Sequence, residues 1–494
     1  MIDLRVLSVA SEVFPLVKTG GLADVTGALP GALAPLGVEI RTLIPGYPAV
    51  MKALGRGEAF QDWPDLFGGP AKLIAGKAGG LSVLALDAPH LFDRPGNPYL
   101  DAGGKDWPDN ALRFGALSHV AAEIGRGLIG GFVPDVIHAH DWQAGLVPAY
   151  LRFGSSPKKS AKPPATIITV HNLAYQGQFP ANLLAALHLP TAAFTMEGVE
   201  YYGQIGFLKA GLSLADHITT VSPTYAAEIQ GSEMGMGLDG LLRHRSHELT
   251  GILNGIDPEV WNPAKDANLA ARYDSGKLEA RKANKAAIRK KFALSAEGNG
   301  LLVTVISRLT SQKGIDLVLA VLPRLVAEGG QLALLGNGDP GLQAELTAAA
   351  ARYPGQVGVI LGYDEGLSHL LQGGADAILV PSRFEPCGLT QLYGLRYGTV
   401  PIVARTGGLA DTVIDANDVA LAARVATGFQ FVPVTADALG VTLARALRCY
   451  RDPPAWRAMQ KRGMAADVSW RRPAVQYAEL YRSLAAARGK ARSA

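Results

Sequence analysis

Short apolar segments rich in β-branched residues alternate with longer Ala- and Leu-rich stretches along almost the whole chain. The longer stretches include 111–127, 315–328, 341–353 and 439–450, which have the length of helices. Strands that are apolar throughout are typical of parallel sheets covered by helices on both faces. The predicted strands are residues 5–10, 39–44, 81–86, 136–140, 166–170, 218–221, 301–307, 332–335, 357–361, 377–380 and 400–404.

These are more strands than one open sheet comfortably holds. A (β/α)8 barrel, which takes about 250 residues, is the rival architecture. However, a Pro- and Gly-rich stretch with Asn254-Gly-Ile-Asp-Pro258 and Trp261-Asn-Pro263 separates two series of strands. We therefore predict two doubly wound, Rossmann-like α/β domains, at residues 1–250 and 251–468.

Composition excludes several other classes of protein. Apolar residues make up 48% of the chain and charged residues 18%, which is too apolar for intrinsic disorder. The two cysteines, Cys387 and Cys449, are too few for a disulfide scaffold or a cysteine-rich zinc site. No apolar run reaches the ~18 residues that span a bilayer. Residues 1–10 resemble a first strand more than a secretion signal, so we expect a cytoplasmic protein without membrane partners.

The net charge of +4 includes a basic segment at 277–291 and a basic C-terminal tail. Proteins that bind nucleic acid usually combine such charge with aromatic residues or a recognisable motif. Here the charge lies mainly in these two segments. We interpret them as solvated helix faces and a frayed end, and we expect no nucleic-acid partner.

One short motif occurs twice. Lys18-Thr-Gly-Gly-Leu-Ala-Asp24 returns as Arg405-Thr-Gly-Gly-Leu-Ala-Asp411, and each copy precedes a predicted helix. The two copies are either independent tight turns or two helix N-termini directed at one anionic ligand. Helix N-termini attract phosphate through their free N–H groups, and glycine lets a ligand approach the backbone. In doubly wound domains such turns lie at the carboxyl edge of the sheet, where ligands bind.

The usual nucleotide motifs are missing. The sequence has no phosphate-binding P-loop, no Gly-x-Gly-x-x-Gly after the first strand and no Asp-x-Asp. This disfavours a hydride-transferring dehydrogenase and a metal-bridged diphosphate. A bound diphosphate would then be neutralised by side-chain cations and helix dipoles. Arg308 and Lys313, in the turn after strand 301–307, are candidates for that role. Taken in isolation, two exposed loop cations are the better interpretation of this turn.

Segment 381–390 follows a predicted strand and precedes a helix that we expect to begin at Gly388. It places the carboxyl group of Glu385 and the thiol of Cys387 close to a helix N-terminus. Glu385 is suited to hydrogen-bond a sugar or to stabilise developing positive charge. The N–H groups of residues 388–390 are suited to hold a phosphate.

Histidines stand at the ends of two strands of the first domain, in His138-Ala-His140-Asp141-Trp142 and in His171-Asn172. Their spacing provides no i,i+4 pair with a third ligand, so a metal site is disfavoured. Polar groups that bind sugar hydroxyls are the better interpretation. For His138 alone we favour a buried core histidine.

Together these segments resemble bacterial and plant glycogen and starch synthases. The matching segments occur in order over nearly the whole chain, at 18–25, 138–142, 170–177, 254–257, 307–314, 382–390 and 405–409. The resemblance implies the GT-B glycosyltransferase fold, in which two Rossmann-like domains face a deep cleft. It also implies transfer of glucose from ADP-glucose to the non-reducing end of an α-1,4-glucan such as glycogen, with retention of configuration. The last helix, at about 472–487 in a segment 469–494, would cross back onto the first domain.

The resemblance also assigns roles to residues. Arg308 and Lys313 would neutralise the departing diphosphate, Tyr363 would stack on adenine, and Asp141 would lie near the transferred sugar or the acceptor. The implied catalytic residues are Glu385, Asp141, His171, Arg308 and Lys313. The implied donor-binding residues are Lys18, Gly20, Gly21, Asn254, Arg308, Lys313, Tyr363, Glu385, Cys387, Gly388, Leu389 and Thr390. No metal or cofactor is implied, since ADP-glucose is a substrate.

One position departs from the wider superfamily of retaining transferases, where a second glutamate often follows the first. Here Tyr393 occupies that position after Glu385. This matches the bacterial and plant branch, and it removes a candidate partner for a double displacement, which needs two carboxylates about 5 Å apart. We therefore favour transfer on the front face, with the leaving phosphate helping to deprotonate the acceptor hydroxyl. A related transferase that uses UDP-glucose and a catalytically silent glucan-binding protein remain as alternatives.

Overall fold

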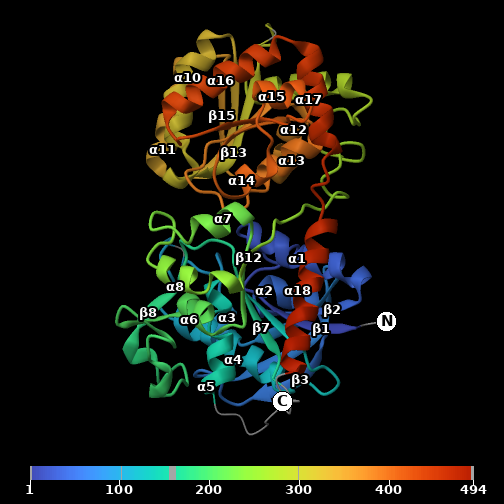
Figure 1. Cartoon of the computed structure of the whole chain (residues 1–494). Coiled ribbons are helices and arrows are strands. Elements are labelled where there is room, and N and C mark those ends of the chain that lie inside the picture. The colour runs from blue at the N-terminus through green and yellow to red at the C-terminus, as the bar shows by residue number, and fades with distance from the viewer. Residues whose placement is uncertain (1–2, 102, 155–162, 299, 491–494) are drawn as a thin grey trace. The chain divides into compact units, whose positions relative to one another are not determined.

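The computed structural model of the chain describes residues 3–101, 103–154, 163–298 and 300–490 (Figure 1). It divides into two compact units. Unit 1 is formed by Met1–Asn254 together with Trp470–Ala494, and unit 2 by Gly255–Ser469. Each unit has its own sheet and its own buried cores, which is the expected property of a domain.

Within the described residues, the main sheet of unit 1 has nine strands in the order β12-β11-β7-β6-β1-β2-β5-β4-β3. All neighbouring pairs are parallel except β3–β4 and β4–β5. The turns after β1, β6 and β7 therefore leave from one edge. The strands are β1 (Leu4–Val9), β2 (Val38–Pro45), β3 (Glu58–Trp63), β4 (Ala71–Ala78), β5 (Leu81–Asp87), β6 (Val136–His140), β7 (Ala165–Val170), β11 (His217–Thr220) and β12 (Leu249–Gly251).

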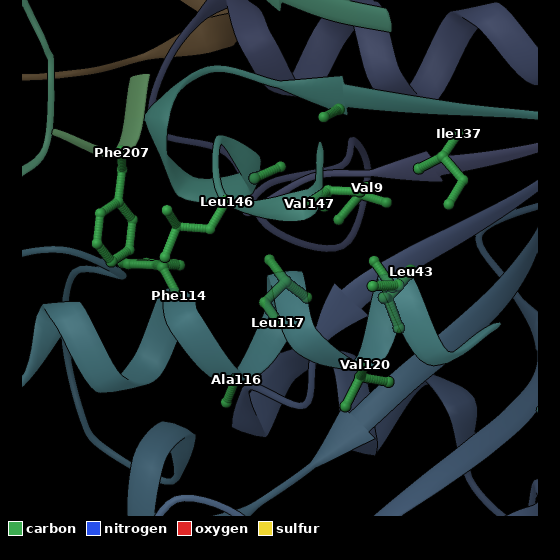
Figure 2. Close-up of a cluster of buried hydrophobic side chains, with 14 of the residues drawn as sticks. Val9, Leu43, Phe114, Ala116, Leu117, Val120, Ile137, Leu146, Val147 and Phe207 are labelled. Atoms are coloured by element: carbon green, nitrogen blue, oxygen red, sulfur yellow. The ribbon is translucent and has the colours of Figure 1, made fainter. Parts of the chain in front are cut away.

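The larger core of unit 1 lies between this sheet and helix α4 (Asn110–Gly125). Figure 2 shows Phe114, Leu117 and Val120 of α4 in one cluster of side chains with Val9 of β1 and Ile137 of β6. All five are fully buried. Apolar side chains recur along this helix at the spacing that places them on one face, which is why it packs on the sheet.

A second core covers the other face of the same sheet. Helix α1 (Gly21–Leu33) packs there on β2, and the last helix, α18 (Arg471–Lys490), packs on β6 and β7. Tyr477 and Tyr481 of α18 are fully buried, and the hydroxyl of Tyr481 lies 2.7 Å from Nδ1 of His138. His138 is thus a buried core histidine, as the sequence led us to expect.

Within the described residues, unit 2 has a six-stranded sheet in the order β15-β14-β13-β16-β17-β18, parallel throughout. The strands are β13 (Leu302–Leu309), β14 (Gln331–Gly338), β15 (Val357–Leu361), β16 (Ala377–Val380), β17 (Val400–Ala404) and β18 (Phe429–Phe431). The helices between and after them are α10 (Ile315–Ala327), α11 (Pro340–Arg352), α12 (Glu365–Gly374), α13 (Thr390–Tyr397), α14 (Gly407–Thr412), α15 (Asp418–Ala422), α16 (Ala436–Tyr450) and α17 (Pro453–Ala465). This alternation confirms the predicted α/β class.

The predicted strands are all present, but the sequence did not indicate several others. β3 and β4 form an antiparallel extension of the sheet, and β3 is mostly exposed or half-buried, so it lacks an apolar run. β12 and β18 are three residues long. A small separate sheet contains β8 (Gln178–Pro180), β9 (Glu200–Tyr201) and β10 (Gln204–Gly206). Segments this short carry no measurable periodicity.

The interpretation of the basic segment 277–291 as a solvated face is wrong for several of its cations. In helix α9 (Arg281–Lys291), Arg281 is 7% exposed. Its guanidinium donates to the Thr399 hydroxyl (2.8 Å), to the Tyr273 hydroxyl (2.6 Å) and to the backbone carbonyls of Ala375 and Tyr397. Lys285 pairs with a carboxylate, Asp376, at 2.6 Å. These cations join α9 to the rest of unit 2, while Lys282 on the same helix is exposed.

We expect Arg281→Ala to lower the free energy of unfolding by about 3 kcal/mol, because several buried acceptors lose their donor and a cavity forms. Urea unfolding followed by circular dichroism measures the change. Lys282→Ala on the same helix is the matched control, since its ion pair with Glu279 is largely exposed and contributes at most about 0.5 kcal/mol. Equal effects of the two substitutions would contradict the buried role of Arg281.

Candidate active site

In unit 1 the turn after β1 is organised by a buried carboxylate, Glu12, which is 3% exposed. Its oxygens accept hydrogen bonds from the backbone N–H of Thr19, the hydroxyl of Thr19 (2.5 Å), the N–H of Gly20 (3.3 Å) and the hydroxyl of Tyr99 (2.5 Å). The first Thr-Gly-Gly copy is therefore held by one side chain. Sequence analysis missed Glu12, although its place just after the first strand was a usable signal.

Lys18 and the two glycines lie where the sequence placed them, at the N-terminus of α1. The ammonium of Lys18 pairs with Asp24 in the first turn of the helix at 2.8 Å. Gly20 is the N-cap, and no side chain in the described part of the chain caps this helix end. Gly21 begins the helix. This combination of a cation with a helix N-terminus suits an anionic ligand.

Asp141, directly after β6, combines burial with a strained backbone. Its φ of 54° and ψ of −169° lie in a region that costs about 1–3 kcal/mol for residues other than glycine. The strain turns its carboxylate towards the end of β7, where Oδ1 accepts the backbone N–H of His171 at 2.7 Å. Burial raises the pKa of Asp141 to about 7, despite the lowering effect of the N–H groups of His171 and Asn172.

The histidines beside Asp141 form a chain of contacts. Nδ1 of His140 lies 3.0 Å from Nε2 of His171, and Nε2 of His140 lies 3.2 Å from the Ser8 hydroxyl. Burial lowers the pKa of His171 to about 3 and that of His140 well below its usual value. Both imidazoles are thus neutral at pH 7 and serve as hydrogen-bonding groups.

Asn254, the last residue of unit 1, is 8% exposed. Its Oδ1 has no hydrogen-bond partner among the described residues. Buried polar atoms are nearly always satisfied in folded proteins, so an unsatisfied one calls for an explanation such as a ligand. This agrees with the sequence-based hypothesis that Asn254 contacts a sugar.

In unit 2 the structure brings together Lys313 and Glu385. The Lys313 ammonium donates to Oε2 of Glu385 at 2.5 Å, and the Ser382 hydroxyl donates to the same oxygen at 2.8 Å. Both charged side chains are largely buried, with 16% and 10% of their surfaces exposed. They line a pocket at the carboxyl ends of β13 and β16, together with Ser307 and Thr390.

The two loops that carry this pair are tied to each other. Gln312 donates its side-chain N–H to the carbonyl of Phe384 (3.2 Å), and the Arg383 N–H donates to the carbonyl of Gln312 (2.8 Å). The Arg383 guanidinium also forms a two-pronged ion pair with Asp316 at 2.6 and 2.8 Å. Sequence analysis missed Arg383 and Asp316, because Arg383 lies in the loop after β16, Asp316 lies in the first turn of α10, and no local pattern links them.

The second Thr-Gly-Gly copy supports Glu385 through the backbone. The N–H of Gly408 donates to the carbonyls of Glu385 and Pro386, each at 3.1 Å. A Cβ at Gly407 would lie 2.1 Å from the Glu385 carbonyl oxygen, and one at Gly408 would lie 2.2 Å from that of Cys387. Here glycine is required by close packing of two chain segments. The glycines of the second copy thus serve to pack against the segment that carries Glu385. Neither of the two sequence-based interpretations anticipated this packing role.

Segment 387–390 leads into α13, but the helix begins at Thr390 and the expected start at Gly388 was wrong. Gly388 has a φ of 69°, which is outside the helical region, and Leu389 is the N-cap. The side-chain N–H groups of Gln391 donate to the carbonyls of Cys387 (3.1 Å) and Gly388 (2.8 Å). Cys387 is buried, at 5% exposed.

Arg308 lies within β13, one residue before the strand ends, and the prediction that it stands in the turn after the strand was wrong. Tyr363 follows β15, so both residues stand at the carboxyl edge of the sheet. Both side chains are exposed, Tyr363 to 75%, and the Tyr363 hydroxyl donates to Glu365 at 3.1 Å. Tyr393, which stands in place of a second glutamate, is stacked on Trp261 with ring centroids 3.6 Å apart. Its ring therefore belongs to an aromatic cluster of unit 2.

In the described ranges no group of three or more His, Cys, Asp or Glu side chains is placed to hold a metal ion. In the same ranges no helix is both long and apolar enough to cross a bilayer.

Comparison with known proteins agrees with this arrangement. Residues 5–244 match the family model described as "Starch synthase catalytic domain", and residues 286–463 match that described as "Glycosyl transferases group 1". A solved structure, the catalytic domain of starch synthase IV from Arabidopsis thaliana bound to ADP and acarbose, is similar with a TM-score of 0.87. It is 33% identical, and the match covers 98% of this chain and 99% of that one. Fold and site thus define a two-domain glycosyltransferase of the GT-B class.

Similar proteins with curated names point to one family within the GT-B glycosyltransferases. A glycogen synthase from Rhodopseudomonas palustris (strain BisB18) is 62% identical over 488 residues, covering 99% of both chains. One from Methylocella silvestris is 57% identical over 484 residues, covering 98% of this chain and 99% of the relative. The chain belongs to the glycogen and starch synthase family.

Asp141 should make stability depend on pH. The native state keeps its proton up to about pH 7, whereas the unfolded chain releases it near pH 4, so this group favours the native state at low pH and loses that contribution as pH rises from about 4 to 7. Asp141→Asn removes the effect. The free energy of unfolding of the variant minus that of the parent chain should therefore be larger at pH 8 than at pH 5. Urea unfolding of both proteins at each pH measures this difference.

The buried histidines act in the opposite direction, since burial holds them neutral in the native state while the unfolded chain protonates them below about pH 6.5. Because both proteins contain them, their effect cancels in the comparison. An equal stability difference at the two pH values would show that Asp141 ionises normally in the folded chain.

Proposed function

We propose that the protein is a glycogen synthase that transfers glucose from ADP-glucose to the non-reducing end of an α-1,4-glucan with retention of configuration. The observation that carries this proposal is the Lys313–Glu385 pair in its pocket, in a chain 62% identical to a curated glycogen synthase. The similar starch synthase structure, which binds ADP, supports an adenine nucleotide as the donor. We also propose that the protein is cytoplasmic and that it needs no metal ion or cofactor.

In unit 2, Lys313 and Arg308 neutralise the diphosphate as it leaves, since a buried ammonium and a guanidinium favour the charge that develops on it. Glu385 holds the glucose near its reacting carbon. The backbone N–H groups of the segment after Cys387, namely those of Gly388, Leu389 and Thr390, bind phosphate. Tyr363, at the carboxyl end of β15, is exposed enough to stack on the base.

In unit 1, Lys18 with Gly20 and Gly21 contributes a cation and a helix N-terminus to donor binding. His171 and Asn254 bind sugar hydroxyls, and the unsatisfied Oδ1 of Asn254 supports this role. Asp141 fixes the backbone of His171 and lies close to the transferred sugar or the acceptor.

The proposed transfer takes place on the front face. The acceptor oxygen forms its bond to the glucose C1 on the side from which the phosphate oxygen departs, and the hydroxyl proton passes to that phosphate oxygen. A double displacement needs a second carboxylate about 5 Å from the first. Related enzymes often have this second carboxylate at the position that Tyr393 occupies here. The ring of Tyr393 is stacked on Trp261.

The test is release of ADP from ADP-glucose, with and without glycogen, and with UDP-glucose as competing donor. We expect ADP release that depends on glycogen and an α-linked product by NMR. Faster transfer from UDP-glucose would favour the related UDP-glucose enzyme. Absence of any turnover with retained glycogen binding would favour a silent glucan-binding protein.

Lys313→Ala and Glu385→Gln should each lower kcat by about 10²–10⁴-fold, because each removes a charge that stabilises the transition state. Lys282→Ala, an exposed substitution in the same unit, is the control and should leave kcat unchanged. Unfolding midpoints check that the fold survives. Near-normal turnover of either site variant would show that the pair does not act in the reaction.

Asp316→Asn should lower kcat by about tenfold through misplacement of the Lys313 and Glu385 loops. Its unfolding midpoint should change little, since the ion pair with Arg383 is half exposed. The exposed pair Arg451–Glu328 at 2.6 Å provides the control Glu328→Gln. The exchanged double variant Arg383→Asp with Asp316→Arg should regain part of the activity. If Asp316→Asn turns over like Glu328→Gln, the ion pair is dispensable.

A further inference from the structure

His171, which we propose to bind a sugar hydroxyl, stands at one end of a column of side chains that begins on the last helix. The column contains Tyr481 of α18, His138 and His140 of β6, and His171, which follows β7. All four belong to unit 1. The transfer described above uses only His171, which leaves the three buried members of the column without a part in it.

Each member of the column contacts the next. The Tyr481 hydroxyl lies 2.7 Å from Nδ1 of His138. The ring of His138 lies on that of His140, with ring centroids 4.0 Å apart and an angle of 34° between the planes. Nδ1 of His140 lies 3.0 Å from Nε2 of His171. Three successive contacts therefore link a side chain of the last helix to His171.

The helix end of the column is closed to solvent. Tyr481, His138 and His140 are fully buried, whereas His171 is half-buried. Both ring nitrogens of His138 have partners, since the Thr169 hydroxyl lies 2.5 Å from its Nε2. Buried polar groups exchange no hydrogen bonds with water, so their protein partners determine their orientation. The column thus has a fixed end at Tyr481 and an end at His171 that a ligand can reach.

The contact between His140 and His171 also determines where His171 carries its proton. Burial lowers the pKa of both imidazoles, so both are neutral at pH 7, and each has one N–H and one bare nitrogen. A single hydrogen therefore lies between Nδ1 of His140 and Nε2 of His171. If His140 donates it, Nδ1 of His171 is left as a donor, and if His171 donates it, Nδ1 is left as an acceptor. The orientation of His140 thus controls the kind of hydrogen bond that His171 offers to a sugar hydroxyl.

We propose that Tyr481 is a positioning residue for the transfer, and that it fixes the orientation of His171 through His138 and His140. The inference rests on the proposed function, in which His171 binds sugar. Without the Tyr481 hydroxyl, Nδ1 of His138 loses its partner and the His138 ring no longer has one orientation. The His140 ring that lies on it then loses its support, and with it the contact that holds His171. A small misplacement of a group that orients a substrate has a large effect on rate.

Tyr481→Phe tests the proposal, since it keeps the ring in the core and removes only the hydroxyl. We expect kcat to fall about tenfold, because the orientation of His171 matters most in the transition state. The KM for ADP-glucose should change by less than about twofold. The rate of ADP release at saturating glycogen, measured over a range of ADP-glucose concentrations, yields both constants.

Tyr150→Phe is the matched control. It removes another fully buried hydroxyl of unit 1, which donates to the Leu187 carbonyl at 2.6 Å and lies outside the column. Both variants should lose a similar amount of stability in urea, since each loses one buried hydrogen bond. Tyr150→Phe should nevertheless keep the kcat of the parent chain. An equal fall of kcat in the two variants would show that Tyr481 serves the core only, which contradicts the proposal.

A double-mutant cycle with His171→Ala tests the route. If Tyr481 acts through His171, Tyr481→Phe should lower kcat about tenfold in the parent chain and less than about twofold in the His171→Ala background. A structural effect of Tyr481 does not depend on the side chain at position 171. The same tenfold loss in both backgrounds would therefore overturn the proposal.

Nitrogen NMR of protein labelled with ¹⁵N-histidine tests the link without turnover, because the two ring nitrogens report which of them carries the proton. The signals of His171 are identified by their loss in His171→Ala. They should shift in Tyr481→Phe and stay in place in Tyr150→Phe. Unchanged His171 signals in Tyr481→Phe would also overturn the proposal. If the parent chain transfers no glucose while these signals still shift, the proposed function fails and the link from Tyr481 to His171 stands.

Discussion

Parallel strand pairing is the constraint on which the rest of this protein depends. In a parallel sheet every strand ends at the same edge, so the loops after β1, β6 and β7 meet in unit 1, as do those after β13, β15 and β16 in unit 2. Residues far apart in sequence, such as Lys313 and Glu385, become neighbours without any local motif that links them. The same rule places Asp141 against His171.

This constraint explains why much of the protein could be predicted. Apolar strand segments are visible in a single sequence, and they imply the sheets, the edge and therefore the region of the site. Glu385, Lys313 and Asp141 could be named as candidates because each lies in the connection that follows a strand. The unsatisfied amide oxygen of Asn254 and the high pKa of Asp141 are physical properties that agree with a role for these residues.

What could not be predicted depends on contacts between distant loops. The position of Glu12 just after the first strand marks it in the sequence, but its role in the turn at Thr19 depends on hydrogen bonds that the sequence does not specify. The ion pair of Arg383 with Asp316 joins the loop after β16 to the first turn of α10, and nothing in either segment specifies the other. Arg281 was misassigned because helical periodicity cannot tell a solvated cation from one that donates to buried carbonyls. In each case the polar partner, and not the residue type, determines the role.

The close packing of Gly407 and Gly408 against residues 385–387 has a consequence for natural sequence variation. Any side chain at these positions displaces the backbone that carries Glu385. A natural variant with a side chain at Gly407 would therefore be expected to lose activity, although Gly407 itself has no functional group. The same Thr-Gly-Gly sequence therefore carries different constraints in its two copies, since a Cβ at Gly20 would meet no atom within 4 Å.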